Sequence, residues 1–193
     1  YQKANPPASK DPKRANGWQT RPKYLVSLLK GWMGDAATAE NGFGYEWLPK
    51  LDPGVDYSSL FLFDRMFKGE VKGGFVYAHN PAQSMPNSNK IRQALEKLDW
   101  LAVGEIHHTE TSDFWHGPGV DPAKIKTEVF LMPSCQGGEK DGTISNSGRW
   151  HMWHHKGIEP MGQSKPMGWM VVEIFKRVRE LYKKDKGVFP EPI

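Results

Sequence analysis

The chain has 193 residues, enough for one sizeable domain with an ordered extension. Aromatic residues make up 12% of it, which excludes an intrinsically disordered chain, and no run approaches the roughly 20 apolar residues of a membrane span. A single cysteine excludes an internal disulfide framework, a four-cysteine zinc site and an iron–sulfur cluster held by this chain alone. The net charge of +4 is mild, and its one basic run is typical of a helix C-terminus rather than of a nucleic-acid surface.

The first 56 residues predict an irregular arm, one helix and a long ordered loop. Residues 1–19 are polar and rich in Pro, without a visible secretory leader or an initiating Met, so we expect a piece of a longer protein. Thr20-Arg21-Pro22 is typical of a helix start, because Pro suits the first turn. Gly34 is expected to end this helix, and residues 35–56, rich in Gly and aromatic residues, predict the ordered loop.

Residues 57–135 alternate between helical and strand patterns. Helices are expected over 57–67 and 87–98, with a short helical stretch from Thr109 toward Trp115. Short, continuously apolar runs predict buried strands at 73–77, 100–103 and 129–132. Together these patterns predict an α/β fold in which a parallel, Rossmann-like βαβαβ sheet carries helices on both faces.

Residues 136–193 are predicted to pack on this core. Residues 136–149 are polar and rich in Gly, which predicts an irregular segment, and apolar residues between 171 and 182 then share one helical face. Gly187 is expected to cap that last helix. The predicted organisation therefore has three parts, residues 1–56, 57–135 and 136–193.

Three loops follow the carboxyl ends of the predicted strands, where open parallel sheets bind ligands. The first contains Asn80 and leads to a helix N-terminus, which favours phosphate. In the second, Glu105 can accept hydrogen bonds from ribose hydroxyls, and Thr109 and Thr111 can donate to phosphate or base. The pattern predicts a nucleotide-binding face, although Thr109 could equally cap a helix and Asn80 could simply make a turn. Neither GxGxxG nor GxxxxGK[ST] occurs, which excludes the usual NAD fingerprint and a P-loop.

The histidines and the cysteine each allow two interpretations. His107-His108 and His151-x-x-His154-His155 contain metal-ligand residue types. The second group lies between tryptophans in a Gly-rich region, so we expect packing and hydrogen bonding, and we predict no metal site. Cys135 could be a nucleophile, but no elbow motif surrounds it, which favours a buried thiol.

Long motifs in this chain resemble the large, catalytic alpha subunit of molybdenum- or tungsten-dependent formate dehydrogenases, members of the molybdopterin oxidoreductase (DMSO reductase) family. The resemblance covers nearly the whole chain. The matching runs include Asn80-Pro81, Lys90-x-Arg92-x-Ala94-Leu95-x-Lys97-Leu98-Asp99-Trp100, Thr109-Glu110-Thr111-x-x-Phe114-Trp115, Glu128 to Pro133, Glu139 to Trp150 and Gly187-x-Phe189-Pro190-Glu191-Pro192.

The resemblance implies an internal fragment of a much longer subunit. That subunit carries bis-molybdopterin guanine dinucleotide with molybdenum or tungsten, an iron–sulfur cluster, and a selenocysteine or Cys metal ligand in a part that is missing here. We therefore expect residues 57–135 to be a dinucleotide-binding core. We expect neither a catalytic residue nor a metal ligand in this fragment, and no activity from the fragment alone.

Residue by residue, the resemblance assigns contacts with the guanine dinucleotide. Ala78 stands in a turn where the family usually has Gly, which a close approach of backbone to ligand favours. Glu105 stands where the family usually has Asp, and its longer side chain should still reach a ribose or guanine edge. The residues assigned in this way are Ala78, His79, Asn80, Glu105, Ile106, Thr109, Thr111, Lys140, Asp141 and Arg149.

The activity implied is oxidation of formate to carbon dioxide, with electrons leaving through iron–sulfur clusters in anaerobic respiration. The expected partners are the remainder of the catalytic subunit, an iron–sulfur electron-transfer subunit and formate, with no nucleic acid and no direct membrane span. The expected location is the periplasm. The alternatives are a fragment of a nitrate or polysulfide reductase of the same family, and a non-enzymatic nucleotide-binding module.

Overall fold

The computed structural model describes residues 6–11, 13–14, 16 and 19–185. The chain divides into two compact units, one formed by residues 1–55 with 179–193 and the other by residues 56–178. No helix among the described residues is both long and apolar enough to cross a membrane. The three-part domain organisation predicted from the sequence stays a prediction.

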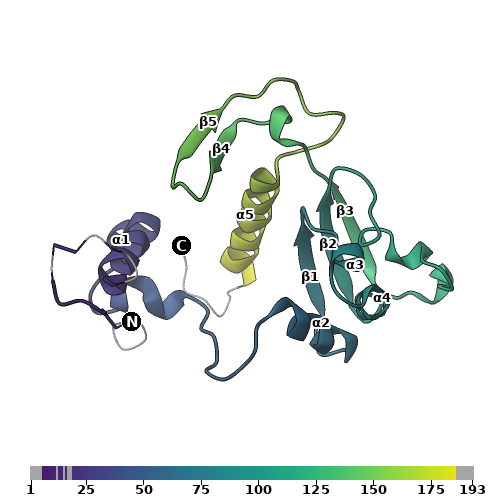
Figure 1. Cartoon of the computed structure of the whole chain (residues 1–193), viewed down its shortest axis with the longest axis horizontal. Coiled ribbons are helices and arrows are strands. Elements are labelled where there is room, and N and C mark those ends of the chain that lie inside the picture. Colours follow the sequence, from purple (N-terminus) through teal and green to yellow (C-terminus); the bar gives the residue numbers. More distant parts are fainter. Residues whose placement is uncertain (1–5, 12, 15, 17–18, 186–193) are drawn as a thin grey trace. The chain divides into compact units, whose positions relative to one another are not determined.

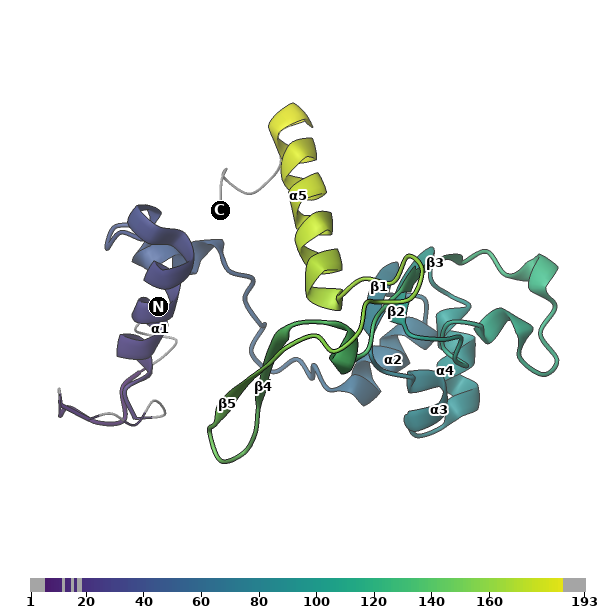
Figure 2. The same ribbon diagram turned by 90° about the horizontal axis from the view of Figure 1, so that it is seen from above.

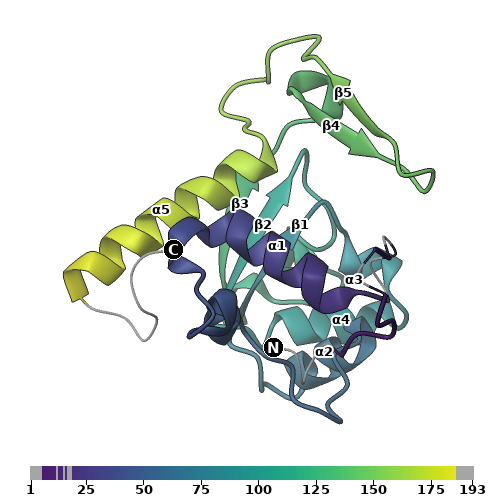
Figure 3. The same ribbon diagram turned by 90° about the vertical axis from the view of Figure 1, so that its left-hand side faces the viewer.

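The first unit is built around helix α1 (Arg21–Met33), with the 3₁₀ turns η1 (Gly34–Ala36) and η2 (Gly42–Trp47) after it (Figure 3). The described residues before Thr20 form neither helix nor strand, as expected for the arm. The predicted helix is confirmed: Pro22 lies in its first turn, and Gly34, with a φ of 53°, ends it. In η2, Gly44 has a φ of 80°, which favours Gly, and a Cβ there would lie 2.1 Å from the Met33 sulfur.

The second unit contains a three-stranded parallel sheet in the order β1-β2-β3, which confirms the predicted α/β fold (Figure 1). The register pairs Gly73 with Trp100 and Trp100 with Glu128. The elements of this layer are α2 (Ser59–Phe67), β1 (Gly73–Tyr77), α3 (Pro81–Ser84), α4 (Ser88–Leu95), β2 (Trp100–Glu105), η3 (Phe114–His116), η4 (Pro122–Lys124) and β3 (Glu128–Pro133).

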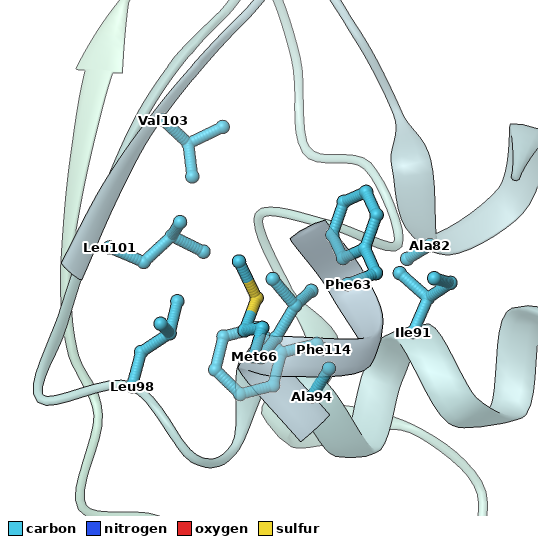
Figure 4. Packing of buried hydrophobic residues seen from close by; sticks show 10 residues of the cluster. Phe63, Met66, Ala82, Ile91, Ala94, Leu98, Leu101, Val103 and Phe114 are labelled. Carbon is cyan, nitrogen blue, oxygen red and sulfur yellow. The ribbon is translucent and has the colours of Figure 1, made fainter. Parts of the chain in front are cut away.

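One face of this sheet carries the hydrophobic core. Leu101 and Val103 of the central strand project toward α2 and α4, and both are completely buried (Figure 4). The helices and the loop after β2 complete the cluster with Phe63, Met66, Ala82, Ile91, Ala94, Leu95, Leu98 and Phe114. Burial of this apolar side is the main force that holds the helices on the sheet.

The opposite face of the sheet is aromatic and partly open. Phe75 and Phe130 lie on it in register, and they remain 53% and 47% exposed. The Phe75 ring meets the Trp100 ring edge-on at 5.2 Å between centroids, so these side chains bury one another. The helices α2, α3 and α4 lie against the core face. Residues of β3 and of the last helix, Met167–Asp185, line one pocket together.

The C-terminal part of this unit contains a hairpin that the sequence did not predict. The strands β4 (Gly142–Ser145) and β5 (His151–His154) pair antiparallel as a separate sheet, preceded by the turn η5 (Gly137–Glu139) (Figure 2). The expectation of an irregular segment over 136–149 is therefore wrong for β4. The turn carried the missed signal, because the Asn146 carboxamide oxygen accepts a 2.9 Å hydrogen bond from the Gly148 N–H.

The last helix is α5 (Met167–Asp185), as predicted. The expected cap at Gly187 and the motif that contains it lie outside the described residues. Much of the apolar surface of α5 is exposed. The side chains of Trp169, Val172 and Phe175 each expose about half of their maximum accessible area.

An ion pair joins α2 to α4 outside the core. The Asp64 carboxylate lies 2.6 Å from the ammonium of Lys68, at the C-cap of α2, and 2.5 Å from the Lys90 ammonium of α4. Hydrogen bonds from these two ammonium groups lower the pKa of Asp64 from 3.8 to about 2. The same contact raises the pKa of Lys68.

Asp64 therefore makes stability depend on pH at the acid end. A folded-state pKa below the unfolded value gives a contribution that is complete above about pH 4 and is lost as the pH falls toward 2. We expect the unfolding free energy of wild type, measured by urea denaturation between pH 2 and 6, to fall more steeply than that of Asp64→Asn. Parallel curves for the two proteins would contradict this role.

Ala78, directly after β1, adopts a left-handed backbone with a φ of 51°. Its N–H donates to the Gly104 carbonyl oxygen of β2 at 3.3 Å, so the pairing of the two strands continues into this residue. A left-handed conformation costs a residue with a Cβ about 1–2 kcal/mol. The family's preference for Gly at this position therefore has a backbone explanation as well as a ligand-based one.

We expect Ala78→Gly to leave the free energy of unfolding unchanged or to raise it by up to about 1 kcal/mol, because relieved strain offsets the extra entropy of the unfolded chain. The control is Ala94→Gly in the last turn of α4, where the side chain is completely buried, so this variant should lose about 1 kcal/mol or more. Urea denaturation of both variants measures the difference. Equal losses in the two would argue against strain at Ala78.

Candidate functional site

The parallel register brings the ends of the three strands to one edge of the sheet. Tyr77 at the end of β1 pairs with Gly104, and Glu105 at the end of β2 pairs with Pro133 at the end of β3. The segments that follow the strands therefore begin side by side, as the sequence predicted. We call residues 78–80, 105–111 and 134 the strand-end surface.

Glu105 ends the central strand of this surface. Its backbone carbonyl accepts a 2.8 Å hydrogen bond from the Ser134 N–H, which extends the pairing of β2 with β3. Its side chain is partly exposed, and no hydrogen bond or ion pair within the described part of the chain engages the carboxylate. The surface thus presents one available anionic acceptor at its centre.

Ser134 is a polar residue of this surface that the sequence analysis missed. It follows β3 and is 2% exposed, and its hydroxyl has no hydrogen-bond partner among the described residues. A buried hydroxyl without a partner is costly, so such a group points to a missing partner. Its place directly after a predicted strand was the available signal. Its neighbour Cys135 is a free, buried thiol, as expected for a structural cysteine.

Asn80 lies in the loop after β1, but its side chain faces the loop after β2. The carboxamide oxygen accepts hydrogen bonds from the Thr111 hydroxyl at 2.8 Å and from the Thr111 N–H at 3.2 Å. The carboxamide nitrogen donates to the Glu110 carboxylate at 2.6 Å and to the Gln83 side chain at 3.3 Å. Two of the predicted site segments are thus joined directly.

The two threonines use their hydroxyls within the protein. Thr111 is completely buried, and its oxygen also accepts a 3.0 Å hydrogen bond from the Ala82 N–H. The Thr109 hydroxyl accepts from the Ser112 N–H at 3.4 Å, and the Ser112 hydroxyl accepts from the Thr109 N–H at 2.8 Å. The alternative interpretation of the sequence was that Thr109 caps a helix; in the structure its bonds close a turn over residues 109–112.

Other predicted residues of the strand-end surface are accessible. His79 is exposed and its Nε2 lies 3.0 Å from the Ser84 hydroxyl. Ile106 is also exposed, directly beside Glu105, although it is apolar. An exposed apolar side chain next to a carboxylate is a suitable neighbour for the flat face and polar edge of a base.

No hydrogen bond or ion pair among the described residues joins Lys140, Asp141 or Arg149 to this surface. Asp141 lies just before β4, where its carboxylate accepts a 2.8 Å hydrogen bond from the Lys156 N–H. Arg149 lies in the turn between β4 and β5 with a φ of 64°. Of the ten predicted site residues, the structure gathers those from the first two loops and leaves these three on the hairpin.

The histidine-rich segment forms part of the hairpin. His151 and His154 belong to β5, and the Trp153 indole N–H donates to His155 Nδ1 at 3.3 Å. Across the residues that the structure describes, no three His, Cys, Asp or Glu side chains gather where they could hold a metal ion.

A cavity of about 910 Å³ lies elsewhere in this unit, along α4. Its walls come from α4 and residues 117–125, and they carry charges of both signs, such as Arg92, Glu96 and Asp121. Glu105 is not among its lining residues.

Comparison with known proteins identifies the chain as part of a much longer protein. It is 53% identical over 193 residues to formate dehydrogenase 2 subunit alpha (cytochrome c-553) of Nitratidesulfovibrio vulgaris, and 48% identical to the formate dehydrogenase subunit alpha of Megalodesulfovibrio gigas. It is also 42% identical to the nitrate-inducible formate dehydrogenase major subunit of Escherichia coli. Each match covers the whole chain but only 19% of the relative.

More distant relatives support the wider family. A nitrate reductase of Shewanella frigidimarina is 33% identical over 132 residues, which is 67% of this chain and 13% of that protein. No family model matches the chain. These matches over the whole chain show that it belongs to the family of formate dehydrogenase alpha subunits and corresponds to one part of such a subunit.

Proposed function

We propose that this chain is the part of a formate dehydrogenase alpha subunit that binds the guanine dinucleotide end of a molybdopterin cofactor, at the strand-end surface. The observation that carries the proposal is the Glu105 carboxylate, which ends the central strand without a partner among the described residues. Ligands of open parallel sheets bind beyond such strand ends.

The residues of this surface suit a guanine nucleotide chemically. Guanine offers N–H donors on one edge, and ribose offers hydroxyls, so a carboxylate acceptor can bind either group. The Ser134 hydroxyl is buried and lacks a partner, and it can donate to a ligand oxygen or accept from a ligand N–H. Ile106 adds exposed apolar surface beside Glu105.

The role of this part is to bind and orient. The cofactor supplies the redox chemistry when it is bound. Glu105 would hold its nucleotide end, Ser134 would supply a second polar contact, and the backbone around Ala78 would limit how closely the ligand approaches β1. The Thr109 and Thr111 hydroxyls already bond within the protein, so they would support the surface from behind.

The proposal extends to the complete subunit. With the rest of its chain, that subunit would oxidise formate to carbon dioxide and pass electrons through iron–sulfur clusters to an electron-transfer subunit in the periplasm, with molybdenum or tungsten in a bis-guanine dinucleotide cofactor. The relatives named formate dehydrogenase match the whole chain, whereas the nitrate reductase of S. frigidimarina matches 67% of it. This difference favours formate over nitrate as the substrate.

We expect Glu105→Ala in the complete subunit to lower cofactor occupancy about tenfold or more under competition, with little loss of folding. The reason is that a hydrogen bond to a charged group contributes about 1.5–3 kcal/mol. Guanine nucleotide released from the purified, denatured enzyme measures the occupancy.

The control is Leu95→Ala, because Leu95 is completely buried in the core. A cavity there should cost about 2–5 kcal/mol of folding stability. Full guanine content in Glu105→Ala would overturn the proposed contact. Normal stability of Leu95→Ala would contradict the packing of α4 on the sheet.

A further inference from the structure

The loop after β2 supplies a capping hydrogen bond to the short helix α3, which follows β1. Asn80 occupies the N-cap position of α3, where an Asn side chain normally accepts a hydrogen bond from its own helix. Asn80 makes no such bond. The first-turn N–H of Ala82 instead donates to the Thr111 hydroxyl oxygen, 29 residues further along the chain.

The Asn80 carboxamide, which does not cap its own helix, forms hydrogen bonds to the loop after β2 instead. Its oxygen accepts from both the hydroxyl and the N–H of Thr111, and its nitrogen donates to Glu110. Thr111 and Ala82 are completely buried, so water cannot replace these partners without an opening of the structure. Separation of the loops would leave several buried donors and acceptors without partners.

Glu110 fixes which way the carboxamide points. The oxygen and nitrogen ends of a carboxamide are nearly equal in size, but only the nitrogen can donate a hydrogen bond to a carboxylate. The Asn80 hydrogen bond, a backbone hydrogen bond and the charge of Arg92 all lower the pKa of Glu110, so this carboxyl group is ionised near neutral pH. When the carboxamide nitrogen faces Glu110, the carboxamide oxygen faces Thr111 and can accept its hydrogen bonds.

We propose that Asn80 and Thr111 are positioning residues that make the loops 78–84 and 106–112 open and close as one unit. The consequence for binding rests on the proposed function, because a single rigid unit would hold Glu105 at a fixed place relative to the turn at Ala78. The coupling of the two loops itself follows from the hydrogen bonds and is independent of the ligand.

The decisive variant is Asn80→Asp in the complete subunit. Asp keeps the acceptor for Thr111 but places a carboxylate against the Glu110 carboxylate, which lay 2.6 Å from the original nitrogen. We expect backbone hydrogen exchange in both loops to accelerate together, by about tenfold or more. The second change Glu110→Gln restores a donor facing an acceptor, so Asn80→Asp/Glu110→Gln should return exchange in both loops to near the wild-type rate.

Thr111 provides a matched pair. Thr111→Val removes the hydroxyl at nearly constant shape and should also accelerate exchange in both loops, whereas Thr111→Ser keeps the hydroxyl and should not. Acceleration in one loop alone, or no rescue by Glu110→Gln, would overturn the coupling. Glu105→Ala tests the proposed function separately: unchanged guanine content in this variant would reject the nucleotide contact, and the exchange results would still decide the coupling.

Discussion

Parallel pairing of three short strands is the constraint on which the second unit depends. Because β1, β2 and β3 run in one direction and in register, their carboxyl ends meet at one edge and their helices pack on one face. The central strand has two tasks, since Leu101 and Val103 anchor the core while Glu105, on the same strand, reaches the edge. A shift of that strand by one residue would turn its core side chains outward and move the carboxylate to the other face.

The sequence was informative where local patterns decide the structure. Helical spacing predicted α1, α4 and α5, and short apolar runs predicted the three parallel strands. The hairpin was missed because its strands have four residues each, too few for a clear alternation.

For the candidate site, too, local sequence patterns predicted positions along the chain but not the contacts between distant residues. Strand ends could be located from the sequence, and with them Asn80, Glu105 and the threonine loop. The partners of these side chains could not, because the Asn80 contact spans 31 residues and depends on how the strands pair. Seven of the residues named by the resemblance to formate dehydrogenases lie on the strand-end surface, and their role in binding stays a prediction. Geometry then separates an available carboxylate from hydroxyls that are already engaged, and it adds Ser134, which was not singled out although it follows a predicted strand.

The central claim is that the strand-end surface binds the guanine dinucleotide through Glu105, with Asn80 and Thr111 behind it. An experimental density map of the cofactor-loaded alpha subunit tests this most directly. The account predicts a guanosine moiety within hydrogen-bonding distance of the Glu105 carboxylate, a ligand atom beside the Ser134 hydroxyl, and Asn80 bonded to Thr111 and Glu110. A map in which the dinucleotide lies away from these strand ends, or in which Asn80 turns from Thr111 to the ligand, would contradict it.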